Sequence, residues 1–141
     1  METKTKHVKL EWVRSRMFTG IDHLGNAISI GYLREDEPEG QGINPSDMLL
    51  LSAAACSAYD VVQILEKAQE PLEDLKVEVS AEQSQEQPYP YVGLHFKYRV
   101  KGAVDPARMQ RAMDLSEEKY CSVLATIKPN LTFTSEFEIE S

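Results

Sequence analysis

Residues 44–62, NPSDMLLLSAAACSAYDVV, decide the fold, because they predict a helix with almost no polar face. Asn44 is a good N-cap, Pro45 suits the first helical position, and Asp47 follows the cap by three residues as a capping-box acid. The helix is expected to run to about Gln69. Because its first half is apolar on every side, it must be buried on every side, and we expect a partner subunit to supply part of that cover.

The segments around this helix predict an α+β domain. Before it, a strand over about residues 9–18 turns at 20–26 and returns to about residue 32 as an N-terminal hairpin. An acidic, glycine-rich connection over residues 34–42 is long enough to be mobile or to cover a site. After the helix come two strands, a second helix, a short helical piece and a last strand, at residues 75–81, 92–100, 105–116, 123–127 and 131–139. We expect these further strands to be antiparallel and residues 1–141 to form one domain.

Charge and hydropathy restrict the partners of the chain. Its net charge of −8 argues against nucleic acid, whose phosphates attract basic proteins. The polar segment Met1–His7 does not resemble a signal peptide, and the apolar run of residues 48–58 is too short to span a bilayer. We therefore expect a cytoplasmic protein without a nucleic-acid or membrane partner. Its thiols would be kept reduced, so that any disulfide would be transient.

The chain has two cysteines, Cys56 inside the apolar helix and Cys121 65 residues later. Neither belongs to a CxxC pair, which excludes a zinc knuckle or a thioredoxin-type motif. Two interpretations stay open, a reactive thiol with its resolving partner or two inert core cysteines. Cys121 precedes an apolar helical piece, where unpaired N–H groups favour a thiolate. Asp60, one turn after Cys56, is expected to raise the pKa of that thiol.

A reactive Cys56 would need a cation from elsewhere in the fold. Arg14 and Arg16 are in phase with the apolar residues of their predicted strand, although their stems could also lie along the sheet edge with the charged heads in water. Asp47 could orient such an arginine. It lies nine residues from Cys56, on the opposite face of the same helix and about 13 Å away, so only the paired helix of a second subunit could bring the two together.

The histidines do not predict a metal site. His7, His23 and His95 share no metal-ligand spacing, and His95 lies on the polar phase of its strand. His23, at the expected hairpin tip, remains an alternative cation for the thiol.

Three segments of the chain resemble the OsmC/Ohr family, the osmotically induced and organic hydroperoxide resistance proteins. Residues 44–62 are similar to its first cysteine signature, and residues 115–123, LSEEKYCSV, are similar to its second. Residues 70–77 fit the OsmC-like branch of the family. The hairpin arginine of the family is best matched by Arg16 or Arg14, and its helix-start glutamate by the shorter Asp47.

The resemblance implies an intertwined homodimer with the cysteine helices packed centrally and the sheets wrapped around them. It also implies a peroxidase acting on organic hydroperoxides, in which Cys56 is oxidised to a sulfenic acid and Cys121 resolves it as a disulfide. No cofactor is expected, and an external dithiol protein would reduce the disulfide. Arg16, held by Asp47 of the partner, would then lower the pKa of Cys56. The alternative is a non-enzymatic stress or binding protein that takes an apolar ligand in the dimer cleft.

Overall fold

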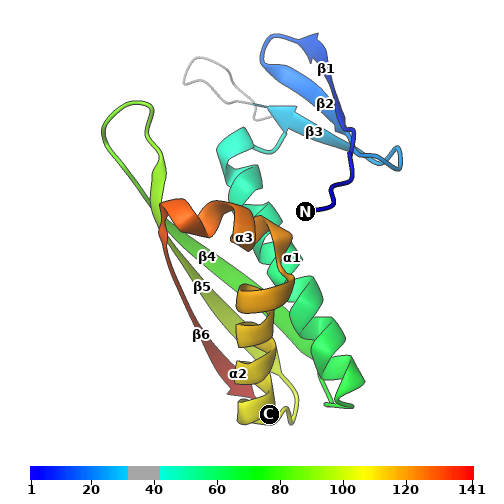
Figure 1. The fold of residues 1–141 in the computed structure, drawn as a ribbon, viewed down its shortest axis with the longest axis vertical. Helices are drawn as coiled ribbons and strands as arrows, with labels where there is room; N and C mark the ends of the chain where they lie inside the picture. Colours follow the sequence, from blue (N-terminus) through cyan, green and yellow to red (C-terminus); the bar gives the residue numbers. More distant parts are fainter. Residues whose placement is uncertain (32–41) are drawn as a thin grey trace. The chain divides into compact units, whose positions relative to one another are not determined.

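The computed structural model describes residues 1–31 and 42–141 of the chain (Figure 1). These residues form two compact units, Met1–Leu49 and Leu50–Ser141, and each unit is considered by itself. The acidic connection predicted at residues 34–42 lies outside the described residues except for Gly42, as does the predicted end of the hairpin at Tyr32. That the chain forms one domain stays a prediction.

The first unit holds a three-stranded antiparallel sheet in which β1 (Lys9–Arg14), β2 (Met17–Ile21) and β3 (Ala27–Gly31) are neighbours in chain order. The prediction of one strand over residues 9–18 is wrong, because the chain reverses after β1 at Ser15, whose φ is 48°. Arg16 therefore lies in a turn and not on a strand face with Trp12. The sequence concealed this turn, since no glycine, proline or asparagine marks it and the apolar alternation continues through it.

The long helix α1 (Pro45–Lys67) begins where the sequence predicts. The Asn44 side-chain oxygen accepts a hydrogen bond from the Ser46 amide at 2.9 Å, which confirms the N-cap. The helix ends two residues before the predicted Gln69, which itself has a positive φ of 57°.

Only one face of α1 is buried within the chain. Its buried residues are Ala53, Ala54, Ser57, Val61 and Leu65. On other faces Leu51 is 52% exposed and Tyr59 is 67% exposed, so the single chain leaves part of the helix uncovered. The cover expected from a partner subunit stays a prediction. From the sequence, the apolar run of residues 48–58 is too short to span a bilayer. The complete helix α1 is long and apolar enough to do so by length and composition, but the core helix of a protein passes the same test. Its buried face packs into the core of the second unit.

The second unit contains a sheet of strand order β4-β5-β6, with β4 at Asp74–Gln83, β5 at Tyr91–Lys101 and β6 at Thr132–Glu140. The predicted antiparallel pairing is confirmed for β4 and β5. It is wrong for β6, which runs parallel to β5. The helices α2 (Pro106–Leu115) and α3 (Ser122–Ile127) lie between these two strands in the chain. Such a crossover returns the chain to the end of the sheet at which β5 begins, so the next strand runs parallel to β5.

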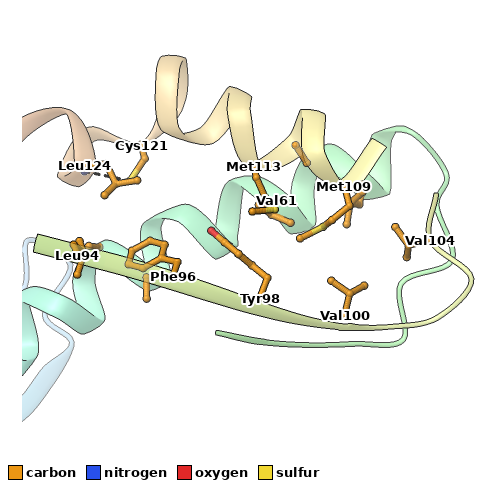
Figure 2. Close-up of a cluster of buried hydrophobic side chains, with 14 residues drawn as sticks. Val61, Leu94, Phe96, Tyr98, Val100, Val104, Met109, Met113, Cys121 and Leu124 are labelled. Atoms are coloured by element: carbon orange, nitrogen blue, oxygen red, sulfur yellow. Dashed lines mark hydrogen bonds between the residues drawn. The ribbon is translucent and has the colours of Figure 1, made fainter. Parts of the chain in front are cut away.

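The core lies between the inner face of this sheet and the helices, as Figure 2 shows. Alternate residues of β5 point toward α1 and α2, which gives the strand its period of two. The buried β5 side chains are Leu94, Phe96, Tyr98 and Val100, and α2 adds Met109, Ala112 and Met113. Phe96 and Phe133 of β6 meet edge to face with ring centroids 5.0 Å apart.

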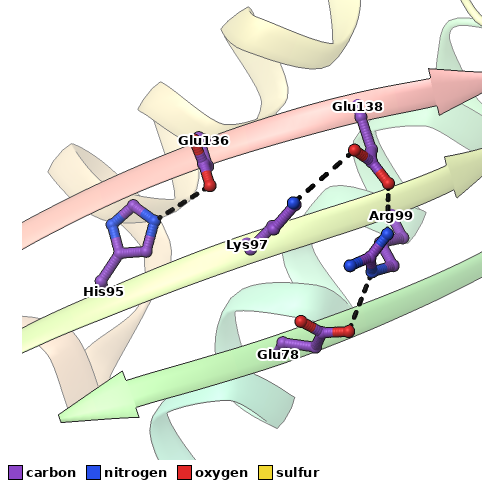
Figure 3. Close-up of polar contacts among 6 residues, drawn as sticks. All are labelled: Glu78, His95, Lys97, Arg99, Glu136 and Glu138. Atoms are coloured by element: carbon purple, nitrogen blue, oxygen red, sulfur yellow. Dashed lines mark hydrogen bonds and ion pairs between the residues drawn. The ribbon is translucent and has the colours of Figure 1, made fainter.

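The outer face of the sheet carries cross-strand ion pairs (Figure 3). Arg99 of β5 bridges Glu78 of β4 and Glu138 of β6. His95 lies on this face beside Glu136, which confirms its polar phase, and its Nδ1 is 2.7 Å from the Thr134 hydroxyl. These contacts belong to the solvent side of the sheet, and the candidate site lies on the core side.

Candidate functional site

The fold brings the two cysteines together. Cys56 lies in the middle of α1 and Cys121 directly precedes α3, yet their sulfur atoms and a carboxylate oxygen of Asp60 all lie within 4.8 Å of one another. Both thiols are free. Two residues separated by 65 positions in the chain thus form one local cluster, which we call the thiol cluster: Cys56, Cys121 and Asp60.

A π-helical turn places Cys121 in this cluster. The turn, η1, covers Ser116–Tyr120, and the Cys121 amide donates to the carbonyl of Ser116 at 2.8 Å, five residues back. Cys121 then leaves the helical conformation and caps α3, its sulfur accepting from the Leu124 amide at 3.4 Å. Such π-turns are rare and often occur at functional sites, because the extra residue redirects a side chain. Here the redirected side chain is a thiol that is only 2% exposed.

The two thiols differ in their environment. Burial, the largest influence, raises the pKa of Cys121 to about 11. The neighbouring Cys56 acts in the same direction, whereas the hydrogen bond from the Leu124 amide acts against it. The predicted helix N-terminus is therefore confirmed, but its pull toward a thiolate is smaller than the cost of burial. Cys121 is therefore a neutral thiol at pH 7. The two thiols also differ in burial, since Cys121 is buried and Cys56 is only half-buried.

A buried chain of hydroxyl groups ends on Asp60. The Ser116 hydroxyl donates to Asp60 Oδ2 at 2.9 Å and lies 3.1 Å from the hydroxyl of Ser57, which is itself hydrogen-bonded to the Tyr98 hydroxyl. The Ser116 hydroxyl has one proton, so at any moment it donates either to the carboxylate or to the Ser57 oxygen. Burial raises the pKa of Tyr98 to about 12, so this phenol stays protonated. Among the described residues, no buried side-chain polar atom lacks a partner.

Sequence reasoning missed the part played by Ser57, Ser116 and Tyr98. The available signal was weak: Ser116 continues the apolar inner stripe of α2, and Ser57 follows Cys56 on a helix that is otherwise apolar there. A serine at an inward-facing helix position needs a polar partner, but the sequence does not say which one. The sequence places Asp60 one helical turn from Cys56, and in the structure it lies close to both sulfurs.

The other candidate residues belong to the first unit. Asp47 is exposed in the first turn of α1, Arg14 ends β1, Arg16 lies in the β1–β2 turn and His23 in the β2–β3 turn. The thiol cluster belongs to the second unit. The roles predicted for Arg16 and Asp47 stay predictions.

Comparison with known proteins gives consistent matches over most of the chain. The family model described as OsmC-like protein matches residues 38–136. Protein YhfA of Escherichia coli K12 is 32% identical over 133 residues, which cover 93% of this chain and 96% of YhfA. Among solved structures, a hypothetical protein from Aquifex aeolicus has a TM-score of 0.82 at 33% identity, with 99% of this chain and 100% of that chain covered.

A more distant structural match is the organic hydroperoxide resistance protein OhrB of Bacillus subtilis. Its TM-score is 0.67 at 14% identity, over 96% of this chain and 98% of OhrB. At that identity the match shows a common fold.

Proposed function

The chain belongs to the OsmC-like family, and from that premise we propose that it is a thiol-dependent peroxidase that reduces organic hydroperoxides. The observation that carries the proposal is the pairing of two free thiols from distant parts of the chain, one half-buried and one buried. The name of the structural neighbour OhrB supports organic hydroperoxides as the substrate class.

The proposed cycle has three steps. The Cys56 thiolate attacks the terminal peroxide oxygen, the O–O bond breaks, and the leaving alkoxide takes a proton to become an alcohol. Cys56 is then a sulfenic acid. The Cys121 sulfur attacks the Cys56 sulfur, water leaves, and a disulfide forms. An external dithiol protein reduces this disulfide by thiol exchange and is itself oxidised. The cycle uses no cofactor, and it suits the reducing cytoplasm predicted from the sequence.

The different environments of the two thiols support different roles for them in the proposed cycle. A hydroperoxide reaches the half-buried Cys56 more readily than Cys121, which is 2% exposed. A neutral thiol such as Cys121 is a poor nucleophile for a peroxide, because the thiolate is the reactive form. It can still resolve a sulfenic acid held next to it, since proximity replaces intrinsic reactivity.

We further propose a homodimer that completes the site. Apolar side chains of both units are exposed in the single chain, including Trp12 in the first unit and Leu51 and Tyr59 in the second. A second copy of the chain would cover them. In that dimer Arg16 is the proposed cation for the Cys56 thiolate, and Asp47 of the partner subunit would hold the guanidinium group.

Steady-state turnover with an organic hydroperoxide and a dithiol reductant, in the presence of a metal chelator, tests this function. We expect Cys56→Ser to lose turnover to the background level of the reductant alone. Cys121→Ser should accumulate a sulfenic acid on Cys56 that a dimedone-type reagent traps. Equal peroxide consumption by the wild type and Cys56→Ser would exclude the proposed enzyme.

The same assay tests the proposed cation. Arg16→Lys keeps the positive charge but loses the planar pair of donors that would bind Asp47 of the partner subunit. We therefore expect the apparent pKa of Cys56 reactivity to rise by about one unit, equivalent to about 1.4 kcal/mol. Arg14→Lys is the matched control and should leave the profile unchanged. If Arg14→Lys alone gives the shift, Arg14 and not Arg16 is the cation. If neither does, His23 is the next candidate.

A second candidate function is binding of an apolar ligand without chemistry. A cavity of about 530 Å³ in the second unit favours it, because it runs along α1 and is lined by Ala55, Ala58, Tyr59, Val62, Gln63, Glu66 and Leu75. Saturable binding of a fluorescent fatty acid, combined with no hydroperoxide turnover, would favour this function over the peroxidase.

A further inference from the structure

We propose that the reduced thiol cluster is also a zinc-binding site, with Cys56, Asp60 and Cys121 as its three protein ligands. The two sulfur atoms and a carboxylate oxygen of Asp60 lie within 4.8 Å of one another. Cys56 and Asp60 are four residues apart on α1 and so lie on the same side of the helix, while Cys121 comes from the start of α3. Three possible ligands, two from α1 and one from the start of α3, thus lie around one point.

The spacing of these atoms is close to what zinc requires. With Zn–S bonds of about 2.3 Å and Zn–O bonds of about 2.0–2.2 Å, tetrahedral angles place neighbouring ligand atoms about 3.5–3.8 Å apart. Side-chain movements of about 1 Å or less therefore bring the donors into the coordination sphere. Three protein ligands leave the fourth position for water.

The carboxylate is already held by an outer group, as metal ligands usually are. The Ser116 hydroxyl, which is fully buried, donates to Asp60 Oδ2 at 2.9 Å. Ser116 is in turn connected to Ser57 and Tyr98, so the whole chain of hydroxyl groups orients one ligand. An isolated ion pair or a solvated carboxylate would not need this support.

The ligand set selects the kind of ion. Thiolates are soft ligands that favour zinc over magnesium or calcium, and a carboxylate beside them is compatible with zinc. Binding forms two Zn–S bonds and one Zn–O bond and releases the two thiol protons to solvent. The ion is not part of the peroxidase cycle. It competes with it, because the same two sulfur atoms cannot bind zinc and form a disulfide.

Binding to the reduced, full-length protein in competition with a chromophoric chelator tests the proposal. We expect one Zn²⁺ per chain when the thiols are reduced with a phosphine, and Co²⁺ in its place should give an intense near-ultraviolet thiolate-to-cobalt band. Oxidation with diamide, which takes two hydrogen atoms from the thiols to form a disulfide, should abolish both signals. Binding that persists after oxidation would overturn the proposal, since it would come from other residues.

Variants identify the ligands. Cys56→Ser and Cys121→Ser should each weaken the cobalt band and lower zinc affinity. Ser116→Ala should lower the affinity by about 10- to 100-fold, the usual effect of losing an outer partner. Asp60→Asn should lower it at least as much while keeping the thiolate band, whereas Asp114→Asn on the exposed side of α2 should have no effect. Equal affinity in Asp60→Asn and Asp114→Asn would overturn the assignment of Asp60. These experiments contain no peroxide and the turnover assay contains no free metal, so the two proposals can fail independently.

Discussion

Single residues in this fold owe their chemistry to burial more than to the sequence around them. Cys121 directly precedes a helix, a position that favours a thiolate, yet burial keeps it protonated. Tyr98 is hydrogen-bonded to Ser57 and still has a raised pKa, because it is buried under the helices. The ionisation of both groups therefore depends on the folded state.

These shifts predict a loss of stability in alkaline solution. Cys121 has a pKa of about 11 when folded and 9.0 when unfolded, so above pH 9 the unfolded chain releases a proton that the folded chain retains. The free energy of unfolding should therefore fall between pH 9 and 11, by about 2 to 3 kcal/mol from this thiol alone. Below pH 9 the thiol should make no difference.

Urea denaturation of the reduced protein from pH 7 to 11 measures this contribution. The slope of stability against pH should become shallower in Cys121→Ala. Cys56→Ser keeps the buried thiol and should retain most of the slope, because burial, and not Cys56, is the largest influence on the Cys121 pKa. A Cys121→Ala slope that matches the wild-type slope would mean that the Cys121 thiol is not shifted by folding.

At the scale of elements, the structure separates what local sequence determines from what tertiary contacts determine. The start of α1 was predictable because Asn44 and Pro45 act on their own neighbours. The alternation of buried and exposed side chains along β5 was predictable, because one face of the strand packs into the core and the other does not. The turn at Ser15 and the parallel direction of β6 were not, since neither depends on a local pattern. Strand direction is set by the crossover, which only the complete fold defines.

The uncovered side of α1 predicts a dimer interface. We expect Leu51→Glu to raise the dissociation constant of the homodimer by at least about tenfold, equivalent to 1.4 kcal/mol, because the carboxylate would be buried against apolar side chains. Tyr120→Glu is a matched control, since Tyr120 is 51% exposed and Leu51 is 52% exposed. Sedimentation velocity at micromolar concentration gives the answer. A wild-type chain that is folded and monomeric there would rule out the dimer.

At the scale of the whole molecule, the site is formed by segments that the chain order keeps apart. The residues alone left open whether Cys56 and Cys121 act together, and only the family resemblance implied it. The fold brings their sulfurs together. The sequence could not show the hydroxyl chain from Tyr98 to Asp60, because it joins β5, α1 and η1 through tertiary packing alone. Nor could it show which thiol is the more exposed, and the assignment of roles depends on that difference.

Formation of a disulfide between these two cysteines is the most direct consequence of the proposed chemistry. Reduced, metal-free protein is mixed with one equivalent of an organic hydroperoxide, alkylated, digested with trypsin without reduction and analysed by mass spectrometry. We predict a loss of two hydrogen atoms per chain and a cross-linked pair of peptides, residues 35–67 with residues 120–141, which contain Cys56 and Cys121. Recovery of both cysteines in alkylated form, with the hydroperoxide unconsumed, would contradict the proposed peroxidase.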